Sequence, residues 1–356
     1  MKKRWISVVM GLLMVCCTTA CQSGESKQSD ETTVKEQGAE GDDSFADLSP
    51  VTVKMVCTSL EGEEPTPEMQ RIAEEIEDKS GGKITFDITI GGSTLFGESE
   101  MYDMLRSGSI DMCNVAPTQF SDIAPEMSVC CWPYVFESAD NINNFWTGES
   151  SQYLKDMVKD KSGIEILTTG FTGVRNVTTQ GIEVRCPDDL DGVKIRCMDS
   201  KIYVDGTNAM GATAVPIAWS ELYFALQTGV VQGQENANTV MEAGSLYEVQ
   251  DTLSLTEHLY SMSTFAANGD FWDALPGEFQ DLIRATFVEH FKAFPEKLQE
   301  ENDKLLEKFK SEYDMKIVED VDKQAFIDAC GEEFMKEFGD DEAYVKMYDA
   351  IKECAK

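Results

Sequence analysis

The chain has 356 residues, of which 42% are hydrophobic, enough for about two domains with a large core. It carries 65 acidic and 30 basic residues, and its formal net charge is -35 at pH 7. Such a surface repels nucleic acid and anionic lipid, so we expect neither as a partner, and an anionic ligand would require locally concentrated positive charge.

The first 20 residues are typical of an export signal, because basic residues 2–4 precede an apolar run that is too short to span a membrane. Thr18 to Cys21 resembles the lipobox of bacterial lipoproteins, which predicts lipidation of Cys21 and an extracytoplasmic protein that touches the membrane only through a lipid anchor. Thr18 stands where the lipobox usually has leucine, so a simple secretory signal and a periplasmic protein remain the alternative. Residues 21–48 are polar and indicate a disordered tether.

The first folded segment predicts an α/β sheet. Apolar alternation indicates strands at residues 51–55, 84–90 and 110–116, and helical spacing indicates helices at about 67–80 and 101–107. We expect Thr66 to cap the first helix, and Gly81 and Gly82 to end it. Strands that alternate with helices favour a parallel sheet with packed helices. A further strand is expected at residues 164–168.

The stretch from Cys186 to Asn236 predicts a second such unit with suggestive polar groups. Val193, Ile195 and Cys197 alternate with Lys194, Arg196 and Met198, which places Arg196 on a strand and away from its apolar face. Ser220 is expected to cap a helix that Gly229 ends, and Asn236 to follow in a turn. A guanidinium, the aromatic ring of Trp219 and an amide would together suit an anionic organic ligand.

The last third of the chain predicts one long helix. It begins near Pro276, carries an apolar stripe that includes Phe279 and Phe287, and meets Pro295, which should kink or interrupt it. A helix of this length could join two lobes. One more strand is expected near residues 315–318, followed by two amphipathic helices.

The sequence offers little that could carry catalysis. Its two histidines, His258 in an expected connector and His290 on the long helix, fit core or hinge roles better than chemistry. Metalloprotease, P-loop, nucleophile-elbow and dinucleotide-binding motifs are missing, and the cysteines form no CxxC pair. We therefore expect neither an enzyme nor a bound cofactor or metal, and a surface hydrolase is the remaining rival of that class.

Several motifs occur together in the second unit. They are GFTGVR ending at Arg175, PDDLDG at 187–192, KIR ending at Arg196, WSELYFALQTG at 219–229 and QGQEN at 232–236. In these motifs the chain resembles the solute-binding proteins of tripartite ATP-independent periplasmic (TRAP) transporters, the DctP family named after a C4-dicarboxylate binder. The resemblance runs from about Val51 to the C-terminal helices.

The resemblance implies a periplasmic-binding-protein-like fold, with two α/β lobes joined by hinge strands and a long bridging helix. Lobe I would comprise residues 49–172 and about 261–300, and lobe II residues 173–260 and about 301–356. In that family the arginine of the KIR strand pairs with the ligand carboxylate. Carried over, Arg196 would be that arginine, assisted by Arg175 and Asn236, with Trp219 lining the cleft.

The first lobe is less well defined at this stage. Thr58, Ser59, Glu98 and Gln119 are candidate ligand contacts, chosen only from their expected positions in loops. Ala116 and Gln119 stand where the sialic-acid binders of the family carry a glutamate and an arginine, so sialic acid is not expected.

The resemblance also implies a function, namely a monomeric extracytoplasmic receptor that captures a small organic acid and delivers it to the membrane permease of a TRAP transporter. A solute-binding lipoprotein of an ABC importer is the same-class alternative. A receptor that presents its ligand-bound form to a sensor kinase is a third possibility.

Overall fold

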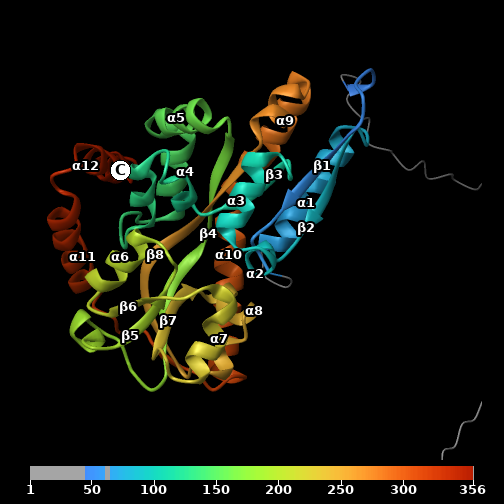
Figure 1. Ribbon diagram of the computed structural model, residues 1–356. Helices are drawn as coiled ribbons and strands as arrows, with labels where there is room; N and C mark the ends of the chain where they lie inside the picture. The colour runs from blue at the N-terminus through green and yellow to red at the C-terminus, as the bar shows by residue number, and fades with distance from the viewer. Residues whose placement is uncertain (1–44, 61–64, 356) are drawn as a thin grey trace, which may run out of the picture. The chain divides into compact units, whose positions relative to one another are not determined.

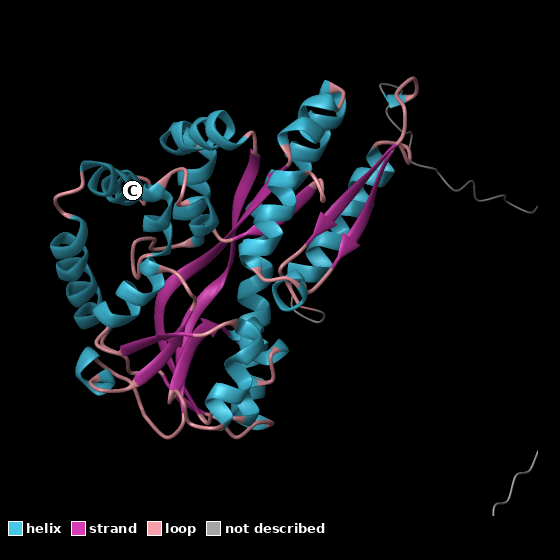
Figure 2. Cartoon of the chain, viewed as in Figure 1, coloured by secondary structure: helices cyan, strands magenta, loops and turns pink. Residues whose placement is uncertain are grey.

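A nine-stranded mixed sheet runs through the part of the chain that the computed structural model describes, residues 45–60 and 65–355. The strand order is β2-β1-β3-β8-β4-β7-β5-β6, and β9 pairs with β8 (Figures 1 and 2). The predicted export signal, Cys21 and residues 21–44 of the predicted tether lie outside the described residues. None of the helices in the described ranges combines the length and hydrophobicity needed to span a bilayer.

The first half of the sheet confirms the expected parallel arrangement. It contains β1 (Val51–Val56), β2 (Ile84–Thr89) and β3 (Met112–Val115), with helices α1 (Pro65–Lys79), α2 (Gly92–Leu95) and α3 (Glu98–Ser107). Strand β1 pairs in parallel with both β2 and β3. The expected capping role of Thr66 was wrong: it lies inside the first turn of α1, and its hydroxyl donates a 2.6 Å hydrogen bond to the carbonyl of Leu60.

Two long antiparallel strands join the halves, and we call them the hinge strands. They are β4 (Glu165–Thr179) and β8 (Thr252–Ala267), and Figure 1 shows them running from β3 at one end towards β5 and β7 at the other. The sequence predicted only the beginning of β4, and His258, expected in a connector, lies within β8. The alternation of apolar and polar residues is weak in these strands, because Ser and Thr side chains also occupy buried positions. They can be buried because they form hydrogen bonds, such as that between Thr169 and Thr264 at 3.0 Å.

The second half of the sheet repeats the parallel pattern. It contains β5 (Lys194–Cys197), β6 (Thr213–Pro216) and β7 (Gly233–Ala237), with helices α6 (Lys201–Ala209), α7 (Trp219–Gln227) and α8 (Asn238–Ala243). Helix α7 starts at Trp219 after Ala218, so Ser220 is not its cap. Asn236 was expected in a turn but lies in β7, where Gln234 accepts a 2.8 Å hydrogen bond from its amide nitrogen. Strand β7 lies between β4 and β5. Its buried amide side chains are accommodated there because they form hydrogen bonds with each other.

Helix α10 (Gly277–Ser311) confirms the predicted long helix, and it continues past Pro295. Its first part contributes Phe279, Phe287 and Phe291 to the larger apolar core, whereas Leu305 and Phe309 belong to a second core beneath α7 and α8. One helix is thus shared by two cores.

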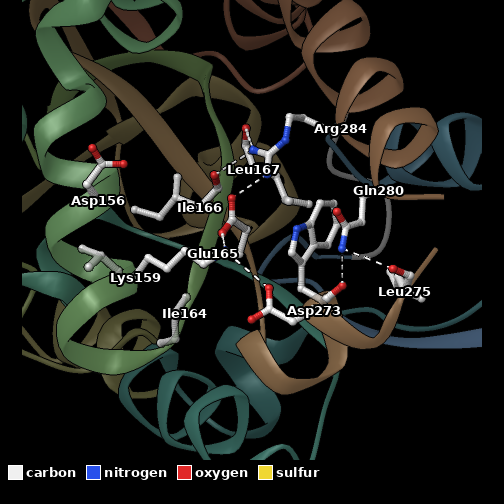
Figure 3. A network of polar contacts seen from close by, with 12 residues as sticks. Asp156, Lys159, Ile164, Glu165, Ile166, Leu167, Asp273, Leu275, Gln280 and Arg284 are labelled. Carbon is white, nitrogen blue, oxygen red and sulfur yellow. Dashed lines mark hydrogen bonds and ion pairs between the residues drawn. The ribbon is translucent and has the colours of Figure 1, made fainter. Parts of the chain in front are cut away.

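Both ends of α10 are fastened by charged contacts. Near its start, Arg284 pairs with Glu165 of β4 at 2.5 Å and donates to the carbonyls of Ile166 and Leu167 at 3.1 and 3.3 Å. Figure 3 shows this network, in which Lys159 of α5 (Gln152–Ser162) also reaches Glu165, at 2.8 Å. Near its end, Lys308 pairs with Glu242 of α8.

The end of the chain packs against both halves. It comprises β9 (Lys316–Val318), α11 (Lys323–Phe338) and α12 (Glu342–Glu353). Asn141 of α4 (Ala139–Thr147) donates a 2.9 Å hydrogen bond to the carbonyl of Ile351 in α12. Helix α12, expected in lobe II, thus contacts α4, which falls in the segment expected to form lobe I.

The remaining short elements complete the description. They are α9 (Gly269–Ala274) and the 3-10 turns η2 (Pro117–Phe120), η3 (Pro125–Cys131), η4 (Glu149–Ser151), η5 (Pro187–Leu190) and η6 (Leu246–Glu248). At the other end of the chain, Phe45 is buried and stacks on Phe279 with ring centroids 5.8 Å apart. Residues 45–48 therefore belong to the folded part and not to the predicted tether.

Candidate functional site

A cavity of about 160 Å³ lies between the two halves of the sheet. Its lining comes from both halves and comprises Thr58, Ser59, Leu60, Glu98, Arg175, Arg196, Met198, Trp219, Asn236 and Val240. A second cavity of about 110 Å³ shares Thr58, Ser59, Glu98, Arg175, Met198 and Val240 with the first. The two form one polar cleft, which we call the front cleft.

The fold brings most of the predicted site residues together at this cleft. Arg175, Arg196, Asn236 and Trp219 line it from β4, β5, β7 and the start of α7, and Thr58, Ser59 and Glu98 line it from the first half. Gln119 is not part of the lining. Its side-chain oxygen accepts a 3.3 Å hydrogen bond from Ser99. A role of Gln119 in ligand binding stays a prediction.

Arg196 is a buried cation without a carboxylate partner among the described residues. Only 3% of it is exposed, and its Nε donates a 2.8 Å hydrogen bond to the carbonyl of Ile217. Burial lowers the pKa of Arg196 to about 10; the charge of Arg175 acts in the same direction, and Glu235 opposes both. Arg196 therefore remains positively charged at neutral pH.

Arg175, in contrast, already has a counter-charge. Its Nε and one terminal nitrogen donate to the two carboxylate oxygens of Glu235 at 2.5 and 2.7 Å, and the same nitrogen reaches the Glu235 carbonyl at 2.7 Å. Burial alone would lower the pKa of Arg175, but the charge of Glu235 outweighs it and raises the pKa. Burial likewise works to raise the pKa of Glu235, yet Arg175 and His258 lower it to about 2.

His258 completes this buried group, which we call the Arg175–Glu235–His258 triad. Its Nε2 lies 3.2 Å from Glu235, and its Nδ1 lies 2.8 Å from the hydroxyl of Thr256. A neutral imidazole fits both contacts, donating from Nε2 and accepting at Nδ1. Burial lowers the pKa of His258, which agrees with that neutral form. Sequence reasoning missed Glu235, although it stands directly beside Asn236 in the QGQEN motif.

Two further walls shape the front cleft. The ring of Trp219 lies against Gly244, where an added Cβ would stand 2.9 Å from the ring, so the glycine makes room for the indole. On the opposite wall Glu98 accepts a 2.9 Å hydrogen bond from the backbone N–H of Ala116. Burial raises the pKa of Glu98, against that bond and the charge of Arg175.

The triad should make the protein less stable in acid. The pKa of Glu235 is depressed, so its stabilising contribution is complete above its ordinary value of 4.5 and is lost as pH falls towards 2. The pKa of His258 is depressed from 6.5, so below pH 6.5 the unfolded chain takes up a proton that the folded one resists. Both shifts have the same sign, and we expect the melting temperature to fall between pH 7 and pH 4.

A histidine variant separates the two contributions. In His258→Gln the fall in melting temperature between pH 7 and pH 5.5 should be smaller than in the wild type, because the group that titrates in this window has been removed. Differential scanning fluorimetry across the pH series measures both proteins. Superimposable pH profiles of the two would rule out a buried neutral His258.

Known proteins resemble this chain in sequence and fold. The model of a family described as bacterial extracellular solute-binding protein, family 7, matches residues 63–340. The 2,3-diketo-L-gulonate-binding periplasmic protein YiaO of Escherichia coli K12 is 28% identical over 264 residues, covering 73% of this chain and 80% of the relative. A solute-binding protein of Chromohalobacter salexigens is 29% identical over 262 residues, with coverages of 72% and 76%.

A solved structure supports the architecture. The TRAP periplasmic solute-binding protein of Citrobacter koseri, solved with bound D-glucuronate, is 25% identical and has a TM-score of 0.75. The match covers 85% of this chain and 99% of that one. The two-lobed α/β fold expected from the sequence is thereby confirmed. Within the described ranges, no group of three or more His, Cys, Asp or Glu side chains is arranged to hold a metal ion.

Proposed function

Since the chain belongs to family 7 of the bacterial extracellular solute-binding proteins, we propose that it is the receptor of a TRAP transporter and binds a small organic acid in the front cleft. Members of this family are solute-binding receptors, and we propose that this chain likewise performs no chemistry on its ligand. The proposal includes delivery of the acid to a membrane permease by a monomeric receptor that is anchored through Cys21.

The observation that carries the proposal is the state of Arg196. A buried charge without a partner is costly, and a ligand carboxylate would supply the missing partner. A guanidinium presents a planar fork of donors that matches a carboxylate in two parallel hydrogen bonds. The Arg196 Nε is occupied by Ile217, so the terminal nitrogens are the ones available to the ligand.

The charges of the cleft also limit the ligand. Arg175 is paired with Glu235, so Arg196 is the guanidinium of the cleft that has no paired carboxylate among the described residues, and it could pair with one ligand carboxylate. A second carboxylate would meet Glu98 on the opposite wall, whereas ligand hydroxyls could donate to that side chain. We therefore propose a hydroxylated monocarboxylate. The relatives that bind 2,3-diketo-L-gulonate and D-glucuronate, both sugar-derived acids, support this class.

A thermal-shift screen tests the proposal directly. Sugar acids and other hydroxy acids should raise the melting temperature, since a ligand at about 100 times its Kd adds roughly 2.7 kcal/mol of stability. C4-dicarboxylates should stabilise less. Hits are then measured by isothermal titration calorimetry.

Neutral analogues provide the matched control, because D-glucose carries an uncharged CH2OH group at the position where D-glucuronate carries its carboxylate. It should give no shift through the front cleft under the same conditions. The proposed clamp is wrong if neutral analogues bind as tightly as the acids and Arg196→Ala abolishes that binding, or if no organic acid in a broad screen binds at all.

A further inference from the structure

Another cavity, of about 290 Å³, lies behind the hinge strands and is larger than the front cleft. We call it the rear cavity. Its walls come from β4, β8, α4, α8 and the middle of α10 around Pro295. It shares no lining residue with the cavity at Arg196 and only Ala237 with the adjoining one. This rear cavity is therefore a separate space. Val174 and Asn176 of β4 line it, whereas Arg175 between them lines the front cleft, so the two spaces lie on opposite faces of β4.

The lining offers a mixture of rings, apolar side chains and amides. Phe171 and Tyr260 contribute rings whose centroids are 5.8 Å apart, and Leu298 forms part of the apolar floor. Asn238 donates a 2.7 Å hydrogen bond to the side-chain oxygen of Asn302, which ties α8 to α10 across the cavity wall. Rings beside amides are suited to a compact molecule with both carbon-rich faces and hydroxyl groups.

Some of these polar groups have no protein partner among the described residues. They are the hydroxyl of Tyr260, the amide nitrogen of Asn302 and the side-chain oxygen of Gln299, whose nitrogen is used by Asp303 at 2.9 Å. The set contains a donor, an acceptor and a hydroxyl that can act as either. A ligand that carries several hydroxyl groups could use all three.

The rear cavity has no free charge to offer. Its one ionisable carboxylate is Glu257, which already pairs with Lys323 at 2.5 Å. No lysine, arginine or histidine of the described chain lines it. An anion would thus lack a counter-charge, and a cation would have to displace Lys323, so an uncharged ligand fits best.

We propose that the rear cavity is a second binding site, and that it takes a small uncharged polyol or monosaccharide. The volume is near the lower end of the range typical of small-molecule sites, which limits the ligand to about the size of a single sugar ring. The site is independent of the carboxylate chemistry proposed for the front cleft.

Saturation-transfer NMR and calorimetry with D-glucose, D-xylose and myo-inositol test this site on the intact mature protein. At least one probe should bind saturably with a Kd in the millimolar range or tighter. Binding should persist in Arg196→Ala, which removes the proposed anchor of the front cleft. Leu298→Trp, which fills the rear cavity, should abolish it.

A milder variant guards against misfolding of Leu298→Trp. Tyr260→Phe keeps the ring and removes only the hydroxyl, so it should weaken binding by about threefold to tenfold with an unchanged melting temperature. The proposal is overturned if no probe binds the wild-type protein saturably. It is also overturned if Arg196→Ala abolishes binding, or if binding survives unchanged in both rear-cavity variants.

Discussion

Replacing Arg196 by alanine should weaken binding of the organic acid by about 2 to 5 kcal/mol, or roughly 30-fold to several thousandfold in Kd. The ligand carboxylate would still be buried in the front cleft but would lose the one cation without a counter-charge there. Calorimetry with the acid identified by the screen measures the loss. Without ligand, Arg196→Ala should keep a melting temperature near that of the ligand-free wild type, because no protein carboxylate loses its partner.

Two further variants show whether geometry or bare charge matters. Arg196→Lys keeps the charge without the fork of donors, so it should recover only a small part of the affinity. Lys194→Ala removes a positive charge from an exposed position two residues away on β5, and should leave Kd nearly unchanged. Wild-type affinity in either Arg196 variant would show that the carboxylate is held elsewhere.

Replacing Glu235 by glutamine should destabilise the protein by about 3 to 5 kcal/mol, because it leaves Arg175 buried without a counter-charge. Glutamine nearly matches the shape of glutamate, so the effect would come from charge and not from packing. Chemical denaturation monitored by tryptophan fluorescence measures the free energy of unfolding.

Glu337→Gln is the matched control, since the pair of Glu337 with Lys201 lies on the surface and solvent screens it. Its melting temperature should stay close to that of the wild type. In Glu235→Gln the released Arg175 should also narrow the gap in affinity between monocarboxylates and dicarboxylates. Unchanged stability together with unchanged selectivity would mean that Glu235 does not neutralise Arg175.

The sequence predicted the parallel strands and the long helix because their apolar residues repeat with clear periods. Strands β1 and β2 and helix α10 show such regular apolar repeats. Strand β8 was missed, since its buried side chains include Ser263 and Thr264, whose hydroxyls form hydrogen bonds with Asn114 of β3 and Thr169 of β4. The local pattern of apolar and polar residues cannot predict hydrogen-bond partners that are distant in the sequence.

The site was predicted in part for the same reason. Sequence motifs singled out Arg175, Arg196, Trp219 and Asn236, and folding brings all four to one cavity. The difference between the two arginines could not be predicted, because it depends on Glu235 and His258 reaching Arg175 through a buried network. Two arginines alone would suggest a dianion, whereas the network leaves one positive charge to be matched.

Helix α10 has a consequence for how the protein unfolds. Its first part supplies aromatic side chains to one core and its last part supplies Leu305 and Phe309 to the other. If one core unfolded locally, part of α10 would lose its packing contacts. The helix would then be less stable, and so would the other core that it helps to form. Because α10 contributes side chains to both cores, we expect the two cores to unfold together as one cooperative unit.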